Sequence, residues 1–150
     1  MPQGYLTENV AIDYIEAAAT ADTTTLTTDV LDMQGYDGVV FIAAFGDVTS
    51  GSVLLLSVLE NTANSTSSPT PTAISGATAG ATAGASDYDA KLIAVDVQKP
   101  TKRYVYATLA RGTQNAVVNG VTAIRYKGSH SCPVTQGSTV LQLTKVQGGN

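Results

Sequence analysis

The chain has 150 residues, of which 43% are hydrophobic and only 13% are charged, and its formal net charge is −4. This length suits one domain with a single core, and a sequence pI near 4.6 argues against wholesale binding of phosphate groups. The single Cys excludes an internal disulfide and no apolar run is long enough to span a membrane, so we expect one soluble domain over residues 1–150 with no membrane partner.

Charge is divided sharply along the sequence. Every Lys and Arg lies at or beyond Lys91, whereas all carboxylates except that of Asp96 lie between Glu8 and Asp89. Residues 1–90 therefore carry a charge of −11, and residues 91–150 carry +7, from eight cations less one carboxylate. We expect acidic strands of the first part to pair with basic strands of the second, within one sheet or across copies in an assembly. Both arrangements favour a structural role over catalysis.

Short segments rich in Val, Ile, Leu, Thr and Tyr alternate with Gly, Pro, Asn and Asp, which predicts an all-β fold. Residues 14–21 include helix-favouring residues but no repeating apolar stripe, so at most one helical turn is expected there. Eight strands suit a single-domain β-sandwich of the jelly-roll type. The expected strands cover residues 9–15, 25–32, 38–45, 52–60, 91–97, 103–109, 116–126 and 139–146.

Two of these strands, within residues 39–45 and 53–59, are apolar on both faces. Since neighbouring residues of a strand point to opposite faces, we expect both faces to be covered. Residues 46–51 between them resemble a hairpin loop, which would place the two strands side by side. The covering is either the chain's own loops or N-terminal arm, or a neighbouring subunit.

Residues 61–89 are rich in Ser, Thr, Ala and Gly, and an Ala-Thr-Ala-Gly unit repeats within residues 76–86. Small side chains bury little area, so we expect one long loop within the domain. It is either exposed to solvent or laid as an arm over an adjacent subunit.

No group of residues predicts a metal site or a catalytic nucleophile. His130 and Cys132 lie close in sequence, but no further His or Cys is present to complete a zinc site, and no third group that would orient a nucleophilic pair is evident. Residues 29–37 and 87–89 gather Asp without the spacing of a calcium-binding loop. We expect neither a metal nor an enzymatic activity.

Binding of nucleotides or nucleic acids is also not expected. The sequence has no glycine-rich motif that would cradle phosphates, so no cofactor is predicted. Residues 99–106 combine cations with Tyr104 and Tyr106, which could suggest nucleic acid. In a strand, however, the two tyrosines share one face and Arg103 lies on the other, which is ordinary for a sandwich.

Two further blocks of sequence carry a resemblance. The first is Val-Leu-Asp-Met-Gln-Gly-Tyr-Asp-Gly-Val-Val-Phe-Ile at residues 30–42, followed by Gly46 and by Thr-Ser-Gly at 49–51. The second comprises residues 102–105, 111–118, 123–126 and 133–137. In this order they resemble the small structural proteins encoded beside the major capsid gene of tailed bacteriophages and prophages. The repeated Ala-Thr-Ala-Gly segment departs from that family's pattern.

The resemblance implies a capsid decoration, or cement, protein, a class commonly built as jelly rolls that sit on the head as dimers or trimers. Such a protein is made in the host cytoplasm, joins the virion, and binds the major capsid protein and itself. From charge and two-sided hydrophobicity we expect the acidic N-terminal part and the apolar strands to supply the contact surface. The expected interface residues are Val39, Phe41, Leu54, Leu56, Val58, Arg103, Tyr104 and Tyr106.

Other functions remain open at this point. A neck or head-completion protein, or a head fibre, would share the same virion. A small β-sandwich hydrolase would instead need paired carboxylates in a cleft, and the acids here fall mainly near expected turns. The symmetry axis, the oligomeric state and the capsid residues contacted are not determined by the sequence.

Overall fold

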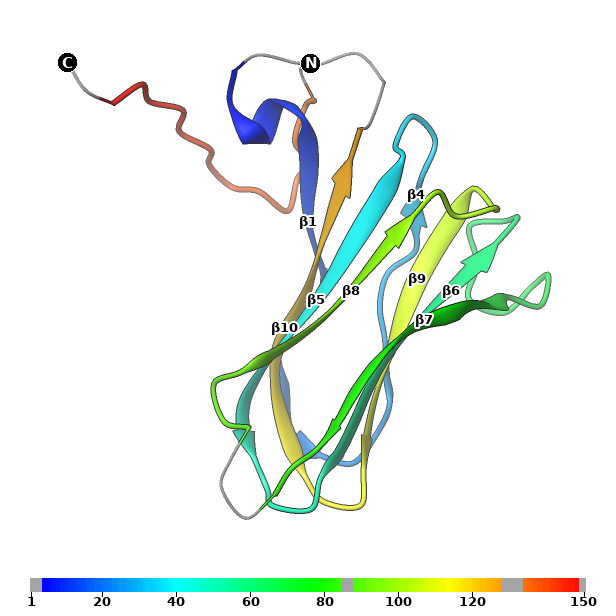
Figure 1. Cartoon of the computed structure of the whole chain (residues 1–150), viewed down its shortest axis with the longest axis vertical. Coiled ribbons are helices and arrows are strands. Elements are labelled where there is room, and N and C mark those ends of the chain that lie inside the picture. The colour runs from blue at the N-terminus through cyan, green and yellow to red at the C-terminus, as the bar shows by residue number, and fades with distance from the viewer. Residues whose placement is uncertain (1–3, 85–87, 128–133, 149–150) are drawn as a thin grey trace.

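Two antiparallel β-sheets face each other in the computed structural model, which describes residues 4–84, 88–127 and 134–148 (Figure 1). The elements are η1 (Leu6–Glu8), β1 (Val10–Glu16), β2 (Ala19–Asp22), β3 (Leu26–Thr27), β4 (Leu31–Asp32), β5 (Gly38–Val48), β6 (Val53–Asn61), β7 (Thr72–Thr82), β8 (Leu92–Gln98), β9 (Tyr104–Gly112) and β10 (Ala116–Tyr126). Sheet A has the order β1-β10-β5-β8, with β2 also pairing with β10. Sheet B has the order β3-β9-β6-β7, with β4 also pairing with β9. The expected all-β sandwich is confirmed.

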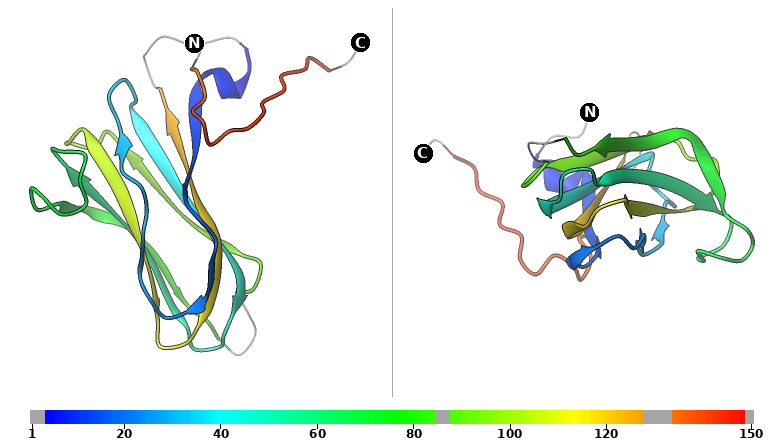
Figure 2. Two further views of the ribbon diagram at one scale, coloured as in Figure 1. Left: turned by 180° about the vertical axis from the view of Figure 1, so that it is seen from behind. Right: turned by 90° about the horizontal axis from the view of Figure 1, so that it is seen from below.

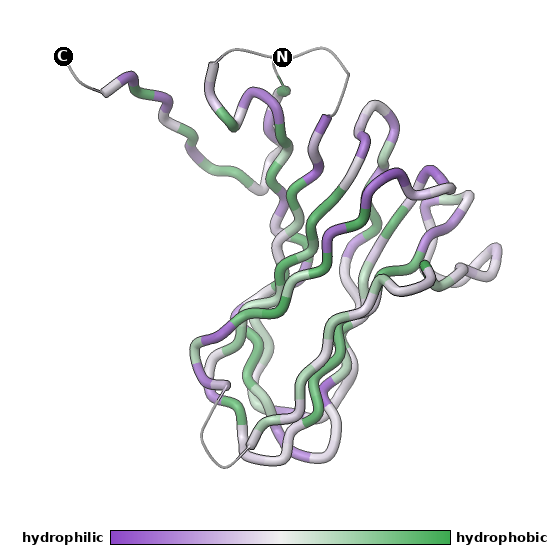
Figure 3. Tube along the Cα trace, viewed as in Figure 1, coloured by the Kyte–Doolittle hydropathy of each residue, from purple (hydrophilic) through white to green (hydrophobic). Residues whose placement is uncertain are grey.

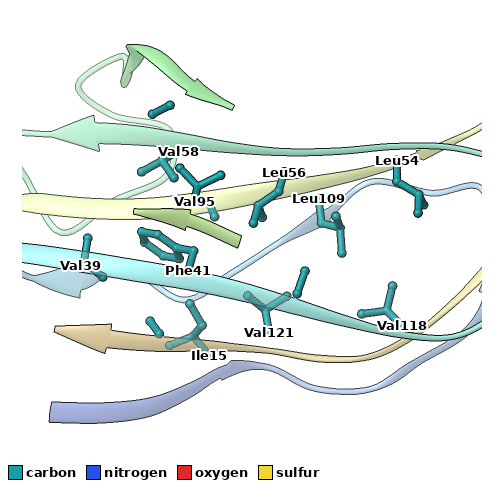
Figure 4. Packing of buried hydrophobic residues seen from close by; sticks show 14 of the residues in the cluster. Ile15, Val39, Phe41, Leu54, Leu56, Val58, Val95, Leu109, Val118 and Val121 are labelled. Atoms are coloured by element: carbon teal, nitrogen blue, oxygen red, sulfur yellow. The ribbon is translucent and has the colours of Figure 1, made fainter. Parts of the chain in front are cut away.

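Inward side chains of both sheets fill the space between them (Figure 4). Along β5, Val39 and Phe41 are fully buried, whereas Val40 between them is partly exposed. Along β6, Leu56 is fully buried while Leu55 is 40% exposed. This period of two is the alternation of a strand with one face in a core, and both sheets contribute to the same core. Further core residues are Leu54, Val58, Val95, Leu109, Val118 and Val121.

The expected hairpin between the two most apolar strands is wrong. β5 lies in sheet A between β10 and β8, and β6 lies in sheet B between β9 and β7. The segment between β5 and β6 crosses from one sheet to the other through a turn in which the Ser52 N–H donates to the Thr49 carbonyl at 3.0 Å. Facing strands can bury their large inward side chains against each other, and this packing overrides the local hairpin pattern.

The expected loop over residues 61–89 is also wrong, because β7 occupies its centre. The repeat alternates strictly: Ala77 and Ala83 are buried, whereas Thr78 and Thr82 are exposed. Alanine on the inner face and Thr or Gly on the outer face is a strand pattern with an unusually small inner side chain. The part before β7 is a loop, and it folds back so that the Asn61 amide donates to the carbonyls of Ser65 and Pro69, each at 2.8 Å.

The N-terminal edge of sheet A is covered by side chains instead of a strand. Gln136 accepts from the Ile12 N–H at 2.7 Å and donates to the Val10 carbonyl at 2.6 Å. The Thr139 hydroxyl accepts from the Tyr14 N–H at 3.2 Å. These groups satisfy the outward backbone of β1, so this edge is closed to further pairing.

Two local predictions fail near the chain's ends. Residues 19–22, where at most a helical turn was expected, form β2, which pairs with β10. Residues 139–146, expected to be a strand, have no strand partner and run as an extended segment. We call residues 140–148 the C-terminal arm; it leaves the sandwich beside β1 and points away from both sheets (Figures 1 and 2). An apolar alternation alone forms no strand without an edge to pair with.

Replacing Leu56 with Ala should lower the free energy of unfolding by about 2–5 kcal/mol, because a fully buried leucine leaves a cavity. The matched control is Leu55→Ala on the outer face of the same strand, which should cost less than about 1 kcal/mol. Chemical denaturation of both variants measures the difference. Equal losses would contradict the assignment of inner and outer faces.

Candidate interaction surface

Most of the expected interface residues lie inside the domain. Val39, Phe41, Leu54, Leu56 and Val58 are at most 1% exposed and belong to the core between the sheets. The prediction that they form a contact surface is therefore wrong for this fold. The sequence pattern indicates strands that are apolar on both faces, but it does not indicate which face points inward. The expected interface residues lie on the inward face.

The three other expected residues lie around the first part of β9. Arg103 is exposed, Tyr104 is partly exposed, and the guanidinium of Arg103 lies 5.1 Å from the centre of the Tyr104 ring. Tyr106 is only 4% exposed, and its hydroxyl donates to the Thr66 carbonyl at 3.4 Å. Burial raises the pKa of Tyr106 above its ordinary value. Arg103 and Tyr104 thus remain accessible, whereas Tyr106 is covered by the loop before β7.

Two ion pairs join the acidic half of the chain to the basic half within single sheets, as the charge division predicted. At sheet B, Arg103, directly before β9, binds Asp32 on β4 through two bonds, Nε to Oδ1 at 2.9 Å and Nη2 to Oδ2 at 2.8 Å. The hydrogen bond from Arg103 is the main reason that the pKa of Asp32 lies below its ordinary value. In sheet A, Arg125 on β10 binds Asp13 on β1 at 2.9 Å.

Arg125 also links the two sheets. Its other terminal nitrogen donates to the Asp32 carbonyl on β4 at 2.8 Å, and its guanidinium lies 4.6 Å from the centre of the Tyr36 ring. The Arg125 and Asp13 side chains are only 16% and 15% exposed. A partly buried cation that donates to two different acceptors and stacks on an aromatic ring holds a fixed geometry. This group fixes one end of the sandwich.

A second buried arginine fixes the other end. Arg111 is 2% exposed and donates to the carbonyls of Thr20 and Ala116, each at 2.7 Å, and to the carbonyl and hydroxyl of Thr24, each at 2.9 Å. All of these acceptors are neutral oxygens, so the charge is stabilised by dipoles of sheet A and of the segment between β2 and β3. Its role is structural, because its donors are directed to backbone and hydroxyl oxygens of the chain itself.

An open hollow of about 450 Å³ lies where residues 33–37 meet residues 99–103. Glu60 holds two of its lining residues: the carboxylate accepts from the N–H of Thr101 at 2.9 Å, from that of Lys102 at 3.2 Å, and from the Thr101 hydroxyl at 2.6 Å. The Glu60 carboxylate thus holds the turn between β8 and β9. The hollow is polar and shallow, which suits a contact with another surface better than an enclosed reaction site.

The outward face of sheet A carries a broad group of apolar side chains. Strand pairing places its side chains in rows that cross β1, β10, β5 and β8. Figure 3 shows the hydrophobic colour along these strands. Tyr14 is 44% exposed and Leu92 is 61% exposed, and the other apolar members are at least partly exposed. Two adjacent rows are Ile12, Ile124, Val40 and Asp96, and Tyr14, Thr122, Ile42 and Ala94.

Two tyrosines lie flat on this face over glycines. A Cβ on Gly38 would collide with the ring of Tyr126, and a Cβ on Gly120, where φ is +132°, would collide with that of Tyr14. The glycines therefore let each ring lie against the sheet backbone. Burial, followed by the hydrogen bond to Asp96 at 2.8 Å, raises the pKa of Tyr126 to about 12. The two rows named above therefore contain a single carboxylate, that of Asp96, and it accepts a hydrogen bond from Tyr126.

The described residues offer no group of three or more His, Cys, Asp or Glu side chains that could hold a metal ion. Asp32 is bound to Arg103, and Asp89 accepts from the Val48 N–H at 2.7 Å. His130, Cys132 and Asp87 lie outside the described residues. Over the same part of the chain, no helix is long and apolar enough to cross a membrane.

Comparison with known proteins gives no assignment. No family profile matches the chain, and no curated protein matches it. The features of the chain that point to a function are therefore the surface described above and the sequence blocks at residues 30–51 and 102–137.

Replacing Arg125 with Met should lower the free energy of unfolding by about 3–5 kcal/mol, because Asp13 would be left as an unpaired, largely buried charge. Arg103→Met is the matched control. It breaks an ion pair whose side chains are 49% and 41% exposed, and should cost less than about 1 kcal/mol. Thermal or chemical unfolding of both variants measures this. A larger loss in the Arg103 variant would contradict the role given to Arg125.

Proposed function

We propose that this chain is a structural protein of a bacteriophage particle that binds the outside of the assembled head as a decoration protein. The observation that carries the proposal is the apolar outward face of sheet A, built from β1, β10, β5 and β8. A sheet face of this kind, open to water in the single chain, is typical of a surface that another protein covers. The partner proposed is the repeating outer surface formed by the major capsid protein.

Parts of the two sequence blocks that resemble phage structural proteins contact each other at one end of the sandwich, which supports the proposal. Asp32 from the first block binds Arg103 from the second, and its carbonyl accepts from Arg125. The Asp37 N–H donates to the Tyr126 carbonyl at 2.9 Å, again between the blocks. The resemblance thus falls on residues that fix the fold. The strand orders β1-β10-β5-β8 and β3-β9-β6-β7 support the jelly-roll type that the resemblance implies.

The use of the acids favours binding over hydrolysis. A glycosidase-like site needs two carboxyl groups facing a cleft, one of them with a raised pKa. Here Asp13 and Asp32 bind arginines, and Glu60 accepts backbone and hydroxyl donors of the turn between β8 and β9. These three carboxylates have structural partners. Burial, followed by the charge of Asp29, raises the pKa of Glu16, but only Asp29 of these two acids lines the open hollow beside residues 64–66, so we propose no enzymatic activity.

A decoration protein stabilises a head by mass action. Because it binds the assembled shell and not the loose subunits, its binding free energy shifts the equilibrium towards the shell. When one copy touches several capsid subunits, each contact can be weak, since the later contacts form at high effective concentration. A broad face with few charges, made of Ile, Val, Ala and Thr, suits many small contacts of this kind.

The first test is the copy number in purified virions. Decoration of the head predicts an amount that rises in proportion to the major capsid protein, because the binding sites repeat with the shell. Quantitative gel densitometry or mass spectrometry against the major capsid protein measures the ratio. Absence from the virion would sink the proposal, and an amount that fits only one ring per particle would favour a neck or head-completion protein.

The second test is binding to purified shells assembled without this protein. Ile42→Lys places a charge at the centre of the outward face of sheet A and should weaken binding roughly ten- to a hundred-fold, the equivalent of losing about 1.5–3 kcal/mol of buried isoleucine. Leu55→Lys, on the outer face of sheet B, is the matched control and should bind like the unchanged protein. Co-sedimentation gives both affinities. Similar binding of both variants would assign the contact to another surface.

A further inference from the structure

The edges of β7 and β8 lie beside each other and are unpaired. Each is the last strand of its sheet and has a hydrogen-bonded strand on one side only. β7 is eleven residues long and contains no charged residue and no proline, the features that usually protect an exposed edge. We call the gap between these two edges the seam. It offers a free backbone edge to any extended segment that fits beside it.

The seam is underfilled. The inward positions at this end of β7 are Ala79 and Ala81, and Ala83 follows directly after the strand, so the chain supplies little volume there. A mainly apolar cavity of about 200 Å³ opens at this point. Its lining residues are Phe45, Leu54, Ala81, Tyr88, Lys91, Leu92 and Ile93. Apolar side chains from a second segment would restore the packing that the alanines leave out.

The C-terminal arm has the properties of such a segment. It is extended, and Leu141, Leu143 and Val146 are 98%, 39% and 73% exposed. Leu141 and Leu143 are two residues apart, so in an extended chain they point to the same side, about 7 Å from each other. Figure 3 shows hydrophobic and hydrophilic segments alternating along the arm. Exposed leucine side chains make no favourable contribution to the folding free energy, whereas burying them would stabilise the arm in a bound position.

The arm cannot be matched to its own seam in the arrangement observed. Its base is held at β1 by Thr139, and Lys145 binds Glu8 at 3.1 Å and lies 5.9 Å from the centre of the Tyr5 ring. β1 and β8 are the two opposite edges of sheet A. The arm therefore starts at one edge, points away from the sandwich, and leaves the seam at the other edge open.

We infer that the C-terminal arm of one copy docks in the seam of a second copy, with Leu141 and Leu143 in the apolar cavity and the arm backbone along the free edge of β7. The occupant is a second copy because the chain itself carries both halves of the contact: an unpaired apolar strand segment and an underfilled, unpaired edge. The edge at β1 is already closed by Gln136 and Thr139, and β3 and β4 at the other edge of sheet B are only two residues long each. The seam is therefore the long edge left for pairing.

The contact joins two different surfaces, so it is head-to-tail. Each copy gives an arm and receives one, and such contacts either close into a ring or continue as a chain. A two-fold dimer joined by one self-complementary patch would not arise this way. The inference does not rest on the proposed function, because a shell-binding protein can be a monomer and an arm-linked ring can bind something else.

The test uses two full-length variants that each lose one half of the contact. Leu141→Ser/Leu143→Ser removes the arm's anchors, and Ala81→Leu fills the cavity from within the chain. Each variant alone should associate roughly 100-fold more weakly or worse, seen as monomers by light scattering at concentrations where the unchanged protein is oligomeric. Gln142→Ser/Thr144→Ser, on the other side of the arm, is the matched control and should keep the oligomer.

Mixing the two defective variants is the decisive step. One still has an intact seam and the other an intact arm, so the mixture should form a one-to-one heterodimer and stop there. Circular dichroism confirms that each variant is folded. A monomeric unchanged protein, an oligomer that survives the arm substitutions, or a mixture that stays monomeric would each overturn the inference. If the unchanged protein forms the oligomer but does not bind purified shells, the result counts against the proposed function alone.

Discussion

The structure depends on the packing of β5 against β6 across the core. Phe41 and Val39 on one strand, and Leu54 and Leu56 on the other, are almost completely buried between the sheets. Because a strand has two faces and both strands are apolar on each, burying one face leaves an apolar face outside. The same residue pattern that builds the core therefore builds the outward face of sheet A. The proposed interaction surface follows from the requirement that folds the chain.

The charged side chains join strands within the domain, a role that the net charge of −4 does not indicate. The acidic first half and the basic second half meet inside each sheet, through Asp32 with Arg103 and Asp13 with Arg125. Arg125 and Arg111 then reach across to the opposite sheet and fix the two ends of the sandwich. All three arginines are held in these contacts, and the outward face of sheet A consists mainly of Ile, Val, Thr and Ala. A surface with few charges offers little electrostatic repulsion against association, which is consistent with a protein that functions within an assembly.

The sequence predicts most of the fold, because strands such as β5, β9 and β10 carry large apolar residues at regular positions. The sequence does not predict β7. Its residues alternate, but alanine stands where a strand usually has a large inward residue, and a run of small residues is typical of a loop. The sequence placed β5 beside β6, because a turn signal says nothing about whether a chain returns to the same sheet. It expected a strand in the C-terminal arm, which has the alternation but no partner edge in its own chain. The apolar residues expected to form the contact surface on β5 and β6 lie on the buried faces of these strands, since the direction of a face is set by tertiary packing.

The central claim is that the outward face of sheet A is covered by a partner in the working particle. Thiol labelling measures this directly, with Ile42→Cys and Leu55→Cys introduced singly into a Cys132→Ser background, so that each protein carries one thiol. Both positions should react with a maleimide in the free protein. On the shell, the account predicts that residue 42 becomes protected while residue 55 still reacts. Equal labelling of residue 42 in the free and shell-bound protein would contradict it.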